Sequence, residues 1–485
     1  MSHAPGTPAD RRGFLEVAAE WLDSVPAISV GLAIAGLALA AYFLPGSDRI
    51  YNHFVWQADA FLHGRAAIAW PVEPTSGNLG NSWFQDVYPL HDAAGRPTGA
   101  LLPFPPLPAI VLMPFVALWG LATDERLVSV ALGAVDVAIA WWALGRVAVS
   151  RRIRIATTVF FALGTVFWYA AQLGTTWFFA HVVAVGFALA AVGVALGADR
   201  GADDAVDDLP TARGLAAAAV DALRAPARLL DGRQFLAGLL FGLACTARLT
   251  VAFGAPFFLF VGGGGSWLRR AVSAGLGAAI PIALLLGYNL ATTGHVIHPG
   301  YDYQYQLEAR GYPSLNYHPA WAIEDSRYLP QNLAIAFLSG PAILPNETQN
   351  SVGDRSPLCT GRTATRGLFD KDCPLALPRD VGMSILLTSP AYLLVIPALR
   401  GGRSRLVLGA VLAVMAIGLV NLMHFSQGWV QFGYRFSNDL VPFALPLVAV
   451  GMARRGGVGL LGLWLVGVSV AVNLWGVIWG NLLGW

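Results

Sequence analysis

The chain has 485 residues, of which 56% are hydrophobic and only 12% are charged, and its mean hydropathy is +0.57. Soluble domains carry about 25% charged residues, so the composition excludes an ordinary soluble protein and predicts an all-α polytopic membrane protein. The net charge of +2 is small, and no basic run with interleaved aromatic residues occurs, so we expect no nucleic-acid partner.

The N-terminal segment 1–25 has no signal-peptide pattern. Arg11 and Arg12 are followed by apolar residues at helical spacing. This pattern predicts an amphipathic helix that lies in the membrane interface on the cytoplasmic side.

Membrane spans are predicted from apolar stretches of about twenty residues. The stretch 234–262 is apolar but interrupted by Arg248, so we predict two short helices that meet near Arg248. The other candidate spans are 26–44, 127–149, 155–172, 177–197, 271–291, 382–399, 405–423, 440–453 and 457–481.

The distribution of arginine gives the topology, because Lys and Arg near span ends favour the cytoplasm. The basic clusters all fall on one side only if 106–120 does not cross the membrane and 234–262 crosses twice. We therefore predict about eleven spans, a cytoplasmic N-terminus and an external C-terminus. The clusters are Arg11–Arg12, Arg146–Arg154, Arg200–Arg233, Arg269–Arg270, Arg400–Arg405 and Arg454–Arg455.

Residues 26–485 then form a single transmembrane domain. Two long external loops, 45–126 and 292–381, and a cytoplasmic linker, 198–233, interrupt it. Segment 106–120, which contains three prolines, is expected to be an external helix that lies in the interface.

Asp48 follows the first span and opens the first long loop. Apolar positions at helical spacing predict a juxtamembrane helix from Asp48 to Gly64. Two interpretations of Asp48 stay open, an N-cap of this helix and a general base at the membrane surface. Asp59 lies eleven residues later, about 16 Å along a regular helix, which is too far to share a metal with Asp48.

A second acidic residue of the first loop is Asp86, in the run Trp83–Pro89. It is a candidate to fold back over Asp48 as a second catalytic acid. An ordinary solvated aspartate is the alternative.

Ionisable residues within or beside spans are costly, so they are functional candidates or partners of one another. Asp136 and Arg248 are one such possible pair. The other interpretation makes Arg248 a phosphate-binding cation at the outer end of a cavity. His181, one turn after Trp177, is either a core histidine or part of a substrate site.

Arg435 and Asp439 are four residues apart at the start of a span. A local salt bridge between them competes with an anion-binding role for Arg435.

The second long loop is rich in polar and aromatic residues around Tyr301, which is typical of a lid that binds a sugar. Its three histidines indicate a metal site only weakly, because no carboxylate stands at a recognisable spacing. Cys359 and Cys373 are able to pair if the loop faces an oxidising compartment.

The order of these elements resembles the GT-C superfamily of integral-membrane glycosyltransferases, notably relatives of protein O-mannosyltransferases and aminoarabinose transferases. Each matching motif is short, and the resemblance extends over nearly the whole chain. The motifs are Ser47-Asp48 after the first span, Leu62-His63-Gly64, Phe104-Pro105-Pro106-Leu107, Gly238 to Arg248, Tyr288-Asn289 with Gly294 and Gly300-Tyr301, and Gly433-Tyr434-Arg435 with Asp439 and Pro442.

The resemblance implies an inverting glycosyltransferase that moves a sugar from a polyprenyl-phosphate donor to a lipid or glycan acceptor. It places the protein in the cell (inner) membrane among membrane lipids, with an external active site. Asp48 takes the role of base with Asp86 as the second catalytic residue, and the implied substrate-binding residues are Arg49, Asp59, His181, Arg248, Tyr301, Tyr434 and Arg435.

The chain departs from the family pattern beside the base, where many relatives have an Asp-Glu pair and this sequence has Asp48-Arg49. A monophosphate is already a good leaving group, so cationic side chains suffice and a divalent metal is possible without being required. A transporter or flippase of a lipid-linked or amphipathic substrate is the alternative, and it predicts inverted repeats and broken helices.

Overall fold

The computed structural model describes most of the chain. Asp48 and Arg49 lie outside the described residues, as do most of the predicted N-terminal helix 1–25 and of the linker 198–233. The described residues are 24–44, 51–76, 78–199, 230–308, 318, 320–350, 353–361, 365–400, 404–426, 428 and 430–485.

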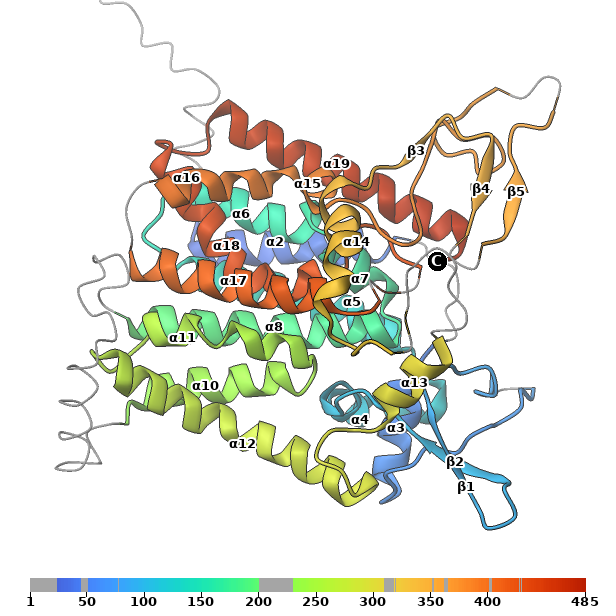
Figure 1. The fold of residues 1–485 in the computed structure, drawn as a ribbon. Coiled ribbons are helices and arrows are strands. Elements are labelled where there is room, and N and C mark those ends of the chain that lie inside the picture. The colour runs from blue at the N-terminus through green and yellow to red at the C-terminus, as the bar shows by residue number, and fades with distance from the viewer. Residues whose placement is uncertain are drawn as a thin grey trace, which may run out of the picture.

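The protein is mostly helical, as predicted, and its longer helices lie roughly parallel to one another in a bundle (Figure 1). The longer ones form where the sequence has long apolar runs. The bundle helices are α2 (Ala27–Tyr42), α5 (Glu125–Leu144), α6 (Arg151–Gly164), α7 (Phe167–Leu173), α8 (Thr176–Ala198), α10 (Gly232–Cys245), η3 (Leu249–Gly254), α11 (Phe257–Phe260), α12 (Trp267–Thr293), α15 (Ile385–Thr388), η6 (Pro390–Leu394), α16 (Val395–Arg400), α17 (Arg405–Met423), α18 (Ser437–Arg454) and α19 (Gly459–Leu483).

Five helices of the described part are long and apolar enough to cross a membrane: α5, α8, α12, α17 and α19. A sixth is obtained if α6 and α7, which are bent by 50° relative to each other, count as one span. The structure therefore agrees with a multi-pass helical membrane protein, but the predicted eleven spans are not reached. The reason is length, because α2, α10 and the 249–260 segment are apolar yet have fewer than 18 helical residues.

The bundle is held together by close helix packing around two apolar cores. α5 packs between α2 and α8, and α10 packs between α8 and α12. Gly238 and Gly242 allow the close contact of α10 with α12. An added Cβ would lie 2.0 Å from the Ala274 carbonyl oxygen at Gly238 and 2.5 Å from the Pro281 ring at Gly242.

The predicted reversal of the chain near Arg248 is confirmed. α10 ends at Cys245, and the chain returns through η3 and α11. The side-chain amide of Gln234, at the start of α10, donates to the carbonyls of Phe258 and Val261 at 3.0 and 3.3 Å. The start of α10 therefore lies beside the end of the returning segment that contains η3 and α11.

The first long loop folds as a small layer at one end of the bundle. It contains α3 (His53–Leu62), the antiparallel strands β1 (Tyr88–His91) and β2 (Pro97–Leu101), α4 (Leu107–Trp119) and η1 (Gly120–Ala122). α4 packs on α3 and is seen end on in Figure 1, across the direction of the bundle helices, as expected for the helix predicted in 106–120.

The second long loop lies at the same end (Figure 1). Its elements are α13 (Gly300–Glu308), η4 (Ser326–Tyr328), α14 (Leu329–Leu333), the π-helical turn η5 (Ala334–Leu338), β3 (Ala342–Ile343), β4 (Glu347–Gln349), β5 (Arg355–Pro357) and β6 (Ala376–Leu377). β3 pairs with β6 and β4 pairs with β5, both antiparallel.

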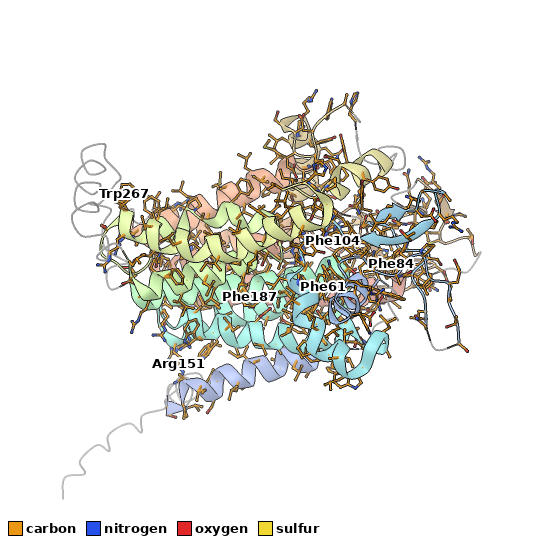
Figure 2. The ribbon with its side chains drawn as sticks, turned by 90° about the horizontal axis from the view of Figure 1, so that it is seen from below. Phe61, Phe84, Phe104, Arg151, Phe187 and Trp267 are labelled. Carbon is orange, nitrogen blue, oxygen red and sulfur yellow. A yellow bond between two sulfur atoms is a disulfide. The ribbon has the colours of Figure 1, made fainter. Side chains whose placement is uncertain are left out.

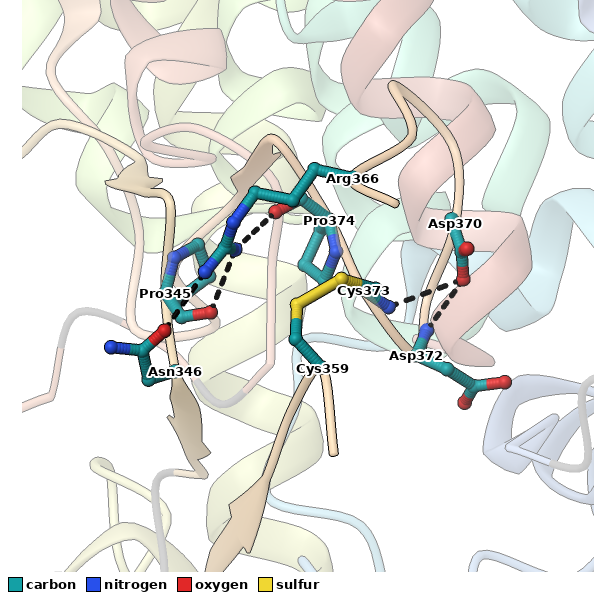
Figure 3. The surroundings of a disulfide bond; sticks show 8 residues. All are labelled: Pro345, Asn346, Cys359, Arg366, Asp370, Asp372, Cys373 and Pro374. Atoms are coloured by element: carbon teal, nitrogen blue, oxygen red, sulfur yellow. Dashed lines mark hydrogen bonds between the residues drawn. A yellow bond between two sulfur atoms is a disulfide. The ribbon is translucent and has the colours of Figure 1, made fainter. Parts of the chain in front are cut away.

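Cys359 and Cys373 form a disulfide in this loop (Figure 3). Beside it, the Arg366 guanidinium donates to the carbonyls of Pro345 and Pro374 at 3.0 and 2.9 Å and to Asn346 Oδ1 at 2.8 Å. These bonds connect Arg366 to residues 8 to 21 positions away in the chain.

Figure 2 places Arg151, at the start of α6, and Trp267, at the start of α12, at the opposite end of the bundle from Phe84 and Phe104 of the first loop. Arg405, at the start of α17, pairs with Asp199 at 2.7 Å.

Candidate functional site

The buried carboxylate of Asp439 organises the end of the bundle that faces the loops. Asp439 lies in the first turn of α18, where the helix dipole favours a negative charge, and it is 1% exposed. Arg248 bonds it through two nitrogens, with Nε 3.2 Å from Oδ1 and Nη2 2.9 Å from Oδ2. Thr250 Oγ1 donates to Oδ2 at 2.7 Å, and Asn421 Nδ2 does so at 3.4 Å.

His181 is the fifth member of this group, with Nδ1 3.0 Å from Asp439 Oδ1. A carboxylate accepts only, so Nδ1 carries the proton, and the tautomer leaves Nε2 as an acceptor. We call Asp439, Arg248, Thr250, Asn421 and His181 the Asp439 cluster.

Two guanidinium groups lie against one aromatic ring beside the Asp439 cluster. Arg248 Cζ is 5.2 Å and Arg435 Cζ is 5.3 Å from the centre of the Phe436 ring. Arg248 remains 20% exposed while Nε and Nη2 bond Asp439. Two guanidinium groups are thus brought together beside one ring, an arrangement that suits an anionic group.

Asp86 is held by Trp177, whose Nε1 donates to its Oδ2 at 2.7 Å. Its backbone is left-handed, with φ of 55°, a conformation that costs energy in a non-glycine residue and is frequent at functional sites. Trp177 and His181 are one turn apart on α8, so this one helix face orients both Asp86 and Asp439.

Tyr301 from α13 lies within the electrostatic reach of Arg248 and of the carboxylates Glu324 and Asp86. Burial raises its pKa to about 12, the charge of Arg248 lowers the pKa, and those of Glu324 and Asp86 raise it. The pKa of Tyr51 is also raised, mainly by burial and further by Asp86. The phenol of Tyr301 thus stays protonated as a hydrogen-bond donor that is influenced by both Arg248 and Asp86.

Contacts between the two long loops bring Tyr301 to this position. α13 packs against β1, and the Tyr88 ring contacts those of His298 and Tyr303 at 6.3 and 5.5 Å between centres. A sequence pattern gives no sign of this pairing, because Tyr88 and His298 are more than 200 residues apart in the chain.

The prediction that the juxtamembrane helix begins at Asp48 is wrong. α3 begins at His53, and Asn52 occupies its N-cap position with non-helical φ of −124°. The Tyr51 carbonyl accepts from the amide of Thr176 at 3.1 Å, which draws the chain out of the helix direction. On the other side of the segment that carries Asp48, the Leu44 carbonyl accepts from Arg126 Nη2 at 2.8 Å.

Asp59 is not brought to this site. Its carboxylate lies 3.5 Å from both Arg65 Nη2 and His63 Nδ1, all near the end of α3. The predicted substrate role of Asp59 therefore receives no support from its contacts, which are local.

The alternative pairing of Asp136 with Arg248 is also wrong, because Arg248 binds Asp439. Asp136 instead packs against Gly186 of α8, where an added Cβ would lie 2.2 Å from its Oδ1.

Tyr434 is 2% exposed, and its hydroxyl has no hydrogen-bond partner among the described residues. Its ring packs edge-on against Phe436, 5.9 Å between centres, so Tyr434 contacts the same ring as both arginines. No group of three metal-ligating side chains occurs among the described residues.

Sequence reasoning missed Asp439, Thr250, Asn421 and Phe436 as members of the site. A signal was present for Asp439, because it and Arg248 are opposite charges at the ends of apolar segments. Thr250 and Asn421 carry no comparable signal, since a single polar residue in an apolar run has many possible partners.

The burial of His53 makes the stability of the folded protein depend on pH. It is fully buried, donates from Nε2 to the Gln85 carbonyl at 2.9 Å and stacks on Phe84 at 3.9 Å. Burial lowers its pKa from 6.5 to about 4. The unfolded chain therefore binds the proton first, and we expect stability to fall by up to about 3 kcal/mol as the pH drops from 6.5 to 4.

Thermal unfolding of the detergent-solubilised protein between pH 7.5 and 4.5 checks this expectation. His53→Asn should flatten the pH dependence below 6.5, whereas His91→Asn, at an exposed position on β1, should leave it unchanged. An equal slope in wild type and His53→Asn would contradict it.

No protein-family model matches this chain, and no curated protein or solved structure matches it either.

Proposed function

We propose that the protein is an inverting glycosyltransferase of GT-C type. It moves a sugar from a polyprenyl-phosphate donor to a lipid or glycan acceptor at the external face of the cell membrane. The observation that carries the proposal is the pair of guanidinium groups, Arg248 and Arg435, on the Phe436 ring, at the end of the bundle where both long loops meet.

A lipid-linked donor accounts for the position of these charges. The polyprenyl chain requires lipid, and its phosphate requires cations at the level where the helices leave the membrane. Arg435 and the remaining N–H groups of Arg248 supply those cations, and Tyr301 adds a neutral donor. Asp439 keeps Arg248 in place, so it is a positioning residue.

The reaction is a single displacement at the anomeric carbon. The acceptor oxygen forms a bond to that carbon as the bond to the phosphate oxygen breaks, and polyprenyl phosphate leaves with the bonding electron pair. A carboxylate takes the proton of the acceptor hydroxyl. By its place after the first span, Asp48 is the proposed base. Tyr51, three residues later, contacts the Trp177 ring at 5.1 Å, and Trp177 binds Asp86, the second proposed acid.

The proposal also includes which of the shorter helices cross the membrane. α2, α10, the 249–260 segment, the 390–400 segment and α18 lie alongside the five longer helices (Figure 1) and are proposed to cross with them. With the bent pair α6–α7 they give the predicted total of about eleven spans. The C-terminus lies at the same end as the two loops (Figure 1), as required by the external assignment.

The test is sugar transfer by the purified protein in liposomes, with a panel of polyprenyl-phosphate sugars and release of polyprenyl phosphate as readout. We expect transfer by wild type and at least a roughly tenfold rise in the apparent KM for the donor in Arg435→Gln, because a charge-assisted contact with phosphate is lost. Arg379→Gln, an exposed arginine of the second loop that binds the Gly340 carbonyl, is the matched control. Movement of the donor across the bilayer without transfer would overturn the proposal in favour of a flippase.

A further inference from the structure

A cavity of about 490 Å³ lies between the first loop and the start of α5, apart from the Asp439 cluster. None of the five residues of the Asp439 cluster lines it. Its walls come from the start of α3, the turn before α8 and the N-terminus of α5. The lining residues are Tyr51, Asn52, Trp56, Asn78, Leu79, Gly80, Leu121–Arg126 and Leu173–Thr175.

Glu125 in this cavity is a buried carboxylate without a partner. It is 4% exposed, and neither Oε1 nor Oε2 accepts a hydrogen bond from any described residue. The neighbouring charges are already engaged: Asp124 Oδ1 caps α5 by accepting from the Leu127 amide at 3.2 Å, and Arg126 donates to the carbonyls of Gln172 and Leu44. An unpaired buried carboxylate is costly, so this site favours a ligand that brings donors or a positive charge.

An apolar groove of about 360 Å³ continues from the cavity along α5. The cavity and the groove share Ala122, Thr123 and Asp124, so they are contiguous. Apart from Thr123 and Asp124, the groove is lined only by Phe115, Trp119, Ala122, Leu127, Val128, Ala131 and Leu132. α5 is one of the helices able to cross a membrane, and Leu127 is 45% exposed, so the groove faces the lipid.

We propose that cavity and groove together bind one membrane lipid whose headgroup carries a primary amine. The ammonium group lies at Glu125, and one acyl chain lies in the groove beside Leu127 and Ala131. An ammonium has three donors, enough for both carboxylate oxygens and one further acceptor on the wall. This site is separate from the proposed donor site and does not depend on glycosyl transfer.

The charge pattern favours this occupant over other lipids. A purely anionic headgroup would bring negative charge next to Asp124 and Glu125. A quaternary ammonium keeps the charge but has no N–H to donate to the buried oxygens. A hydroxyl-only headgroup has donors and lacks the charge.

Native mass spectrometry of the full chain in detergent tests the proposal with three added lipids. We expect phosphatidylethanolamine to bind about tenfold more tightly than phosphatidylcholine or phosphatidylglycerol. Glu125→Gln should abolish this preference, while Glu73→Gln, an exposed glutamate of the same loop, should keep it. Equal binding of the three lipids by wild type, or an unchanged preference in Glu125→Gln, would overturn the proposal.

Two further variants test whether an acyl chain binds in the groove, and they keep the proposal testable if Glu125→Gln fails to fold. Ala131→Trp fills the groove from an exposed position and should weaken phosphatidylethanolamine binding about tenfold. Val135→Trp, one turn along α5 at a 51% exposed position outside the groove, should not. If free ethanolamine competes as well as the lipid does, or if Ala131→Trp binds like Val135→Trp, the groove holds no acyl chain and the proposal fails.

Discussion

Asp439→Asn is expected to be the most destabilising single substitution at the loop end of the bundle. Asparagine keeps the volume and removes the charge, so the partly buried guanidinium of Arg248 loses its counter-ion. Removing one partner of a buried ion pair costs about 3–5 kcal/mol, because the other charge is left uncompensated. Here the loss also affects Thr250, Asn421 and His181, all of which bond the same carboxylate.

Thermal unfolding in detergent measures this effect. The matched control is Asp59→Asn, which removes a partly exposed carboxylate 3.5 Å from Arg65 and should cost about 1 kcal/mol or less. A double substitution, Asp439→Asn with Arg248→Gln, should recover part of the loss because it removes the orphaned charge. Equal effects of Asp439→Asn and Asp59→Asn would show that Asp439 does not organise the site.

Asp48→Asn is expected to have the largest effect on activity. Removal of a general base lowers the rate about 10²- to 10⁴-fold. The proposed donor site consists of Arg248, Arg435 and Tyr301, and the proposed role of Asp48 is proton transfer, so we expect kcat to fall while the KM for the donor changes little. Initial rates of polyprenyl-phosphate release in liposomes separate the two constants.

Asp86→Asn tests which of the two acids is the base. If Asp86→Asn eliminates transfer and Asp48→Asn does not, the roles are reversed. Asp92→Asn is the control on the same loop, since its carboxylate only binds the turn at Ala94 and Arg96. Transfer at the wild-type rate by Asp48→Asn, with normal folding, would contradict the assignment of Asp48.

Several features of the fold were predictable because they depend on local composition. Apolar runs specify where helices form, and the arginines that flank them sort one end of the bundle from the other. The same charge pattern required a reversal at Arg248, which occurs, and a separate helix in 106–120, where α4 forms. The number of spans was less predictable, because short apolar helices such as α10 fall below the length that marks a crossing.

The site was predictable only as a set of separate candidates. His181, Arg248, Tyr301 and Arg435 were recognised as polar or charged residues at the ends of apolar segments. Their partners were not, and two predicted relationships failed: Arg248 does not pair with Asp136, and α3 does not begin at Asp48. Each failure has a tertiary cause, since Asp439 competes for Arg248 and Thr176 binds the Tyr51 carbonyl.

The amino-acid sequence by itself determined that the protein is mostly helical, with several apolar helices able to cross a membrane and its polar loops at one end. It did so because hydropathy and charge act on each segment independently. Only the tertiary structure decided which charges meet: Arg248 with Asp439 across 191 residues, Asp86 with Trp177, and Glu125 with none of the described residues. A buried charge is stabilised by whatever donor packing brings within about 3 Å, and a sequence does not contain that distance.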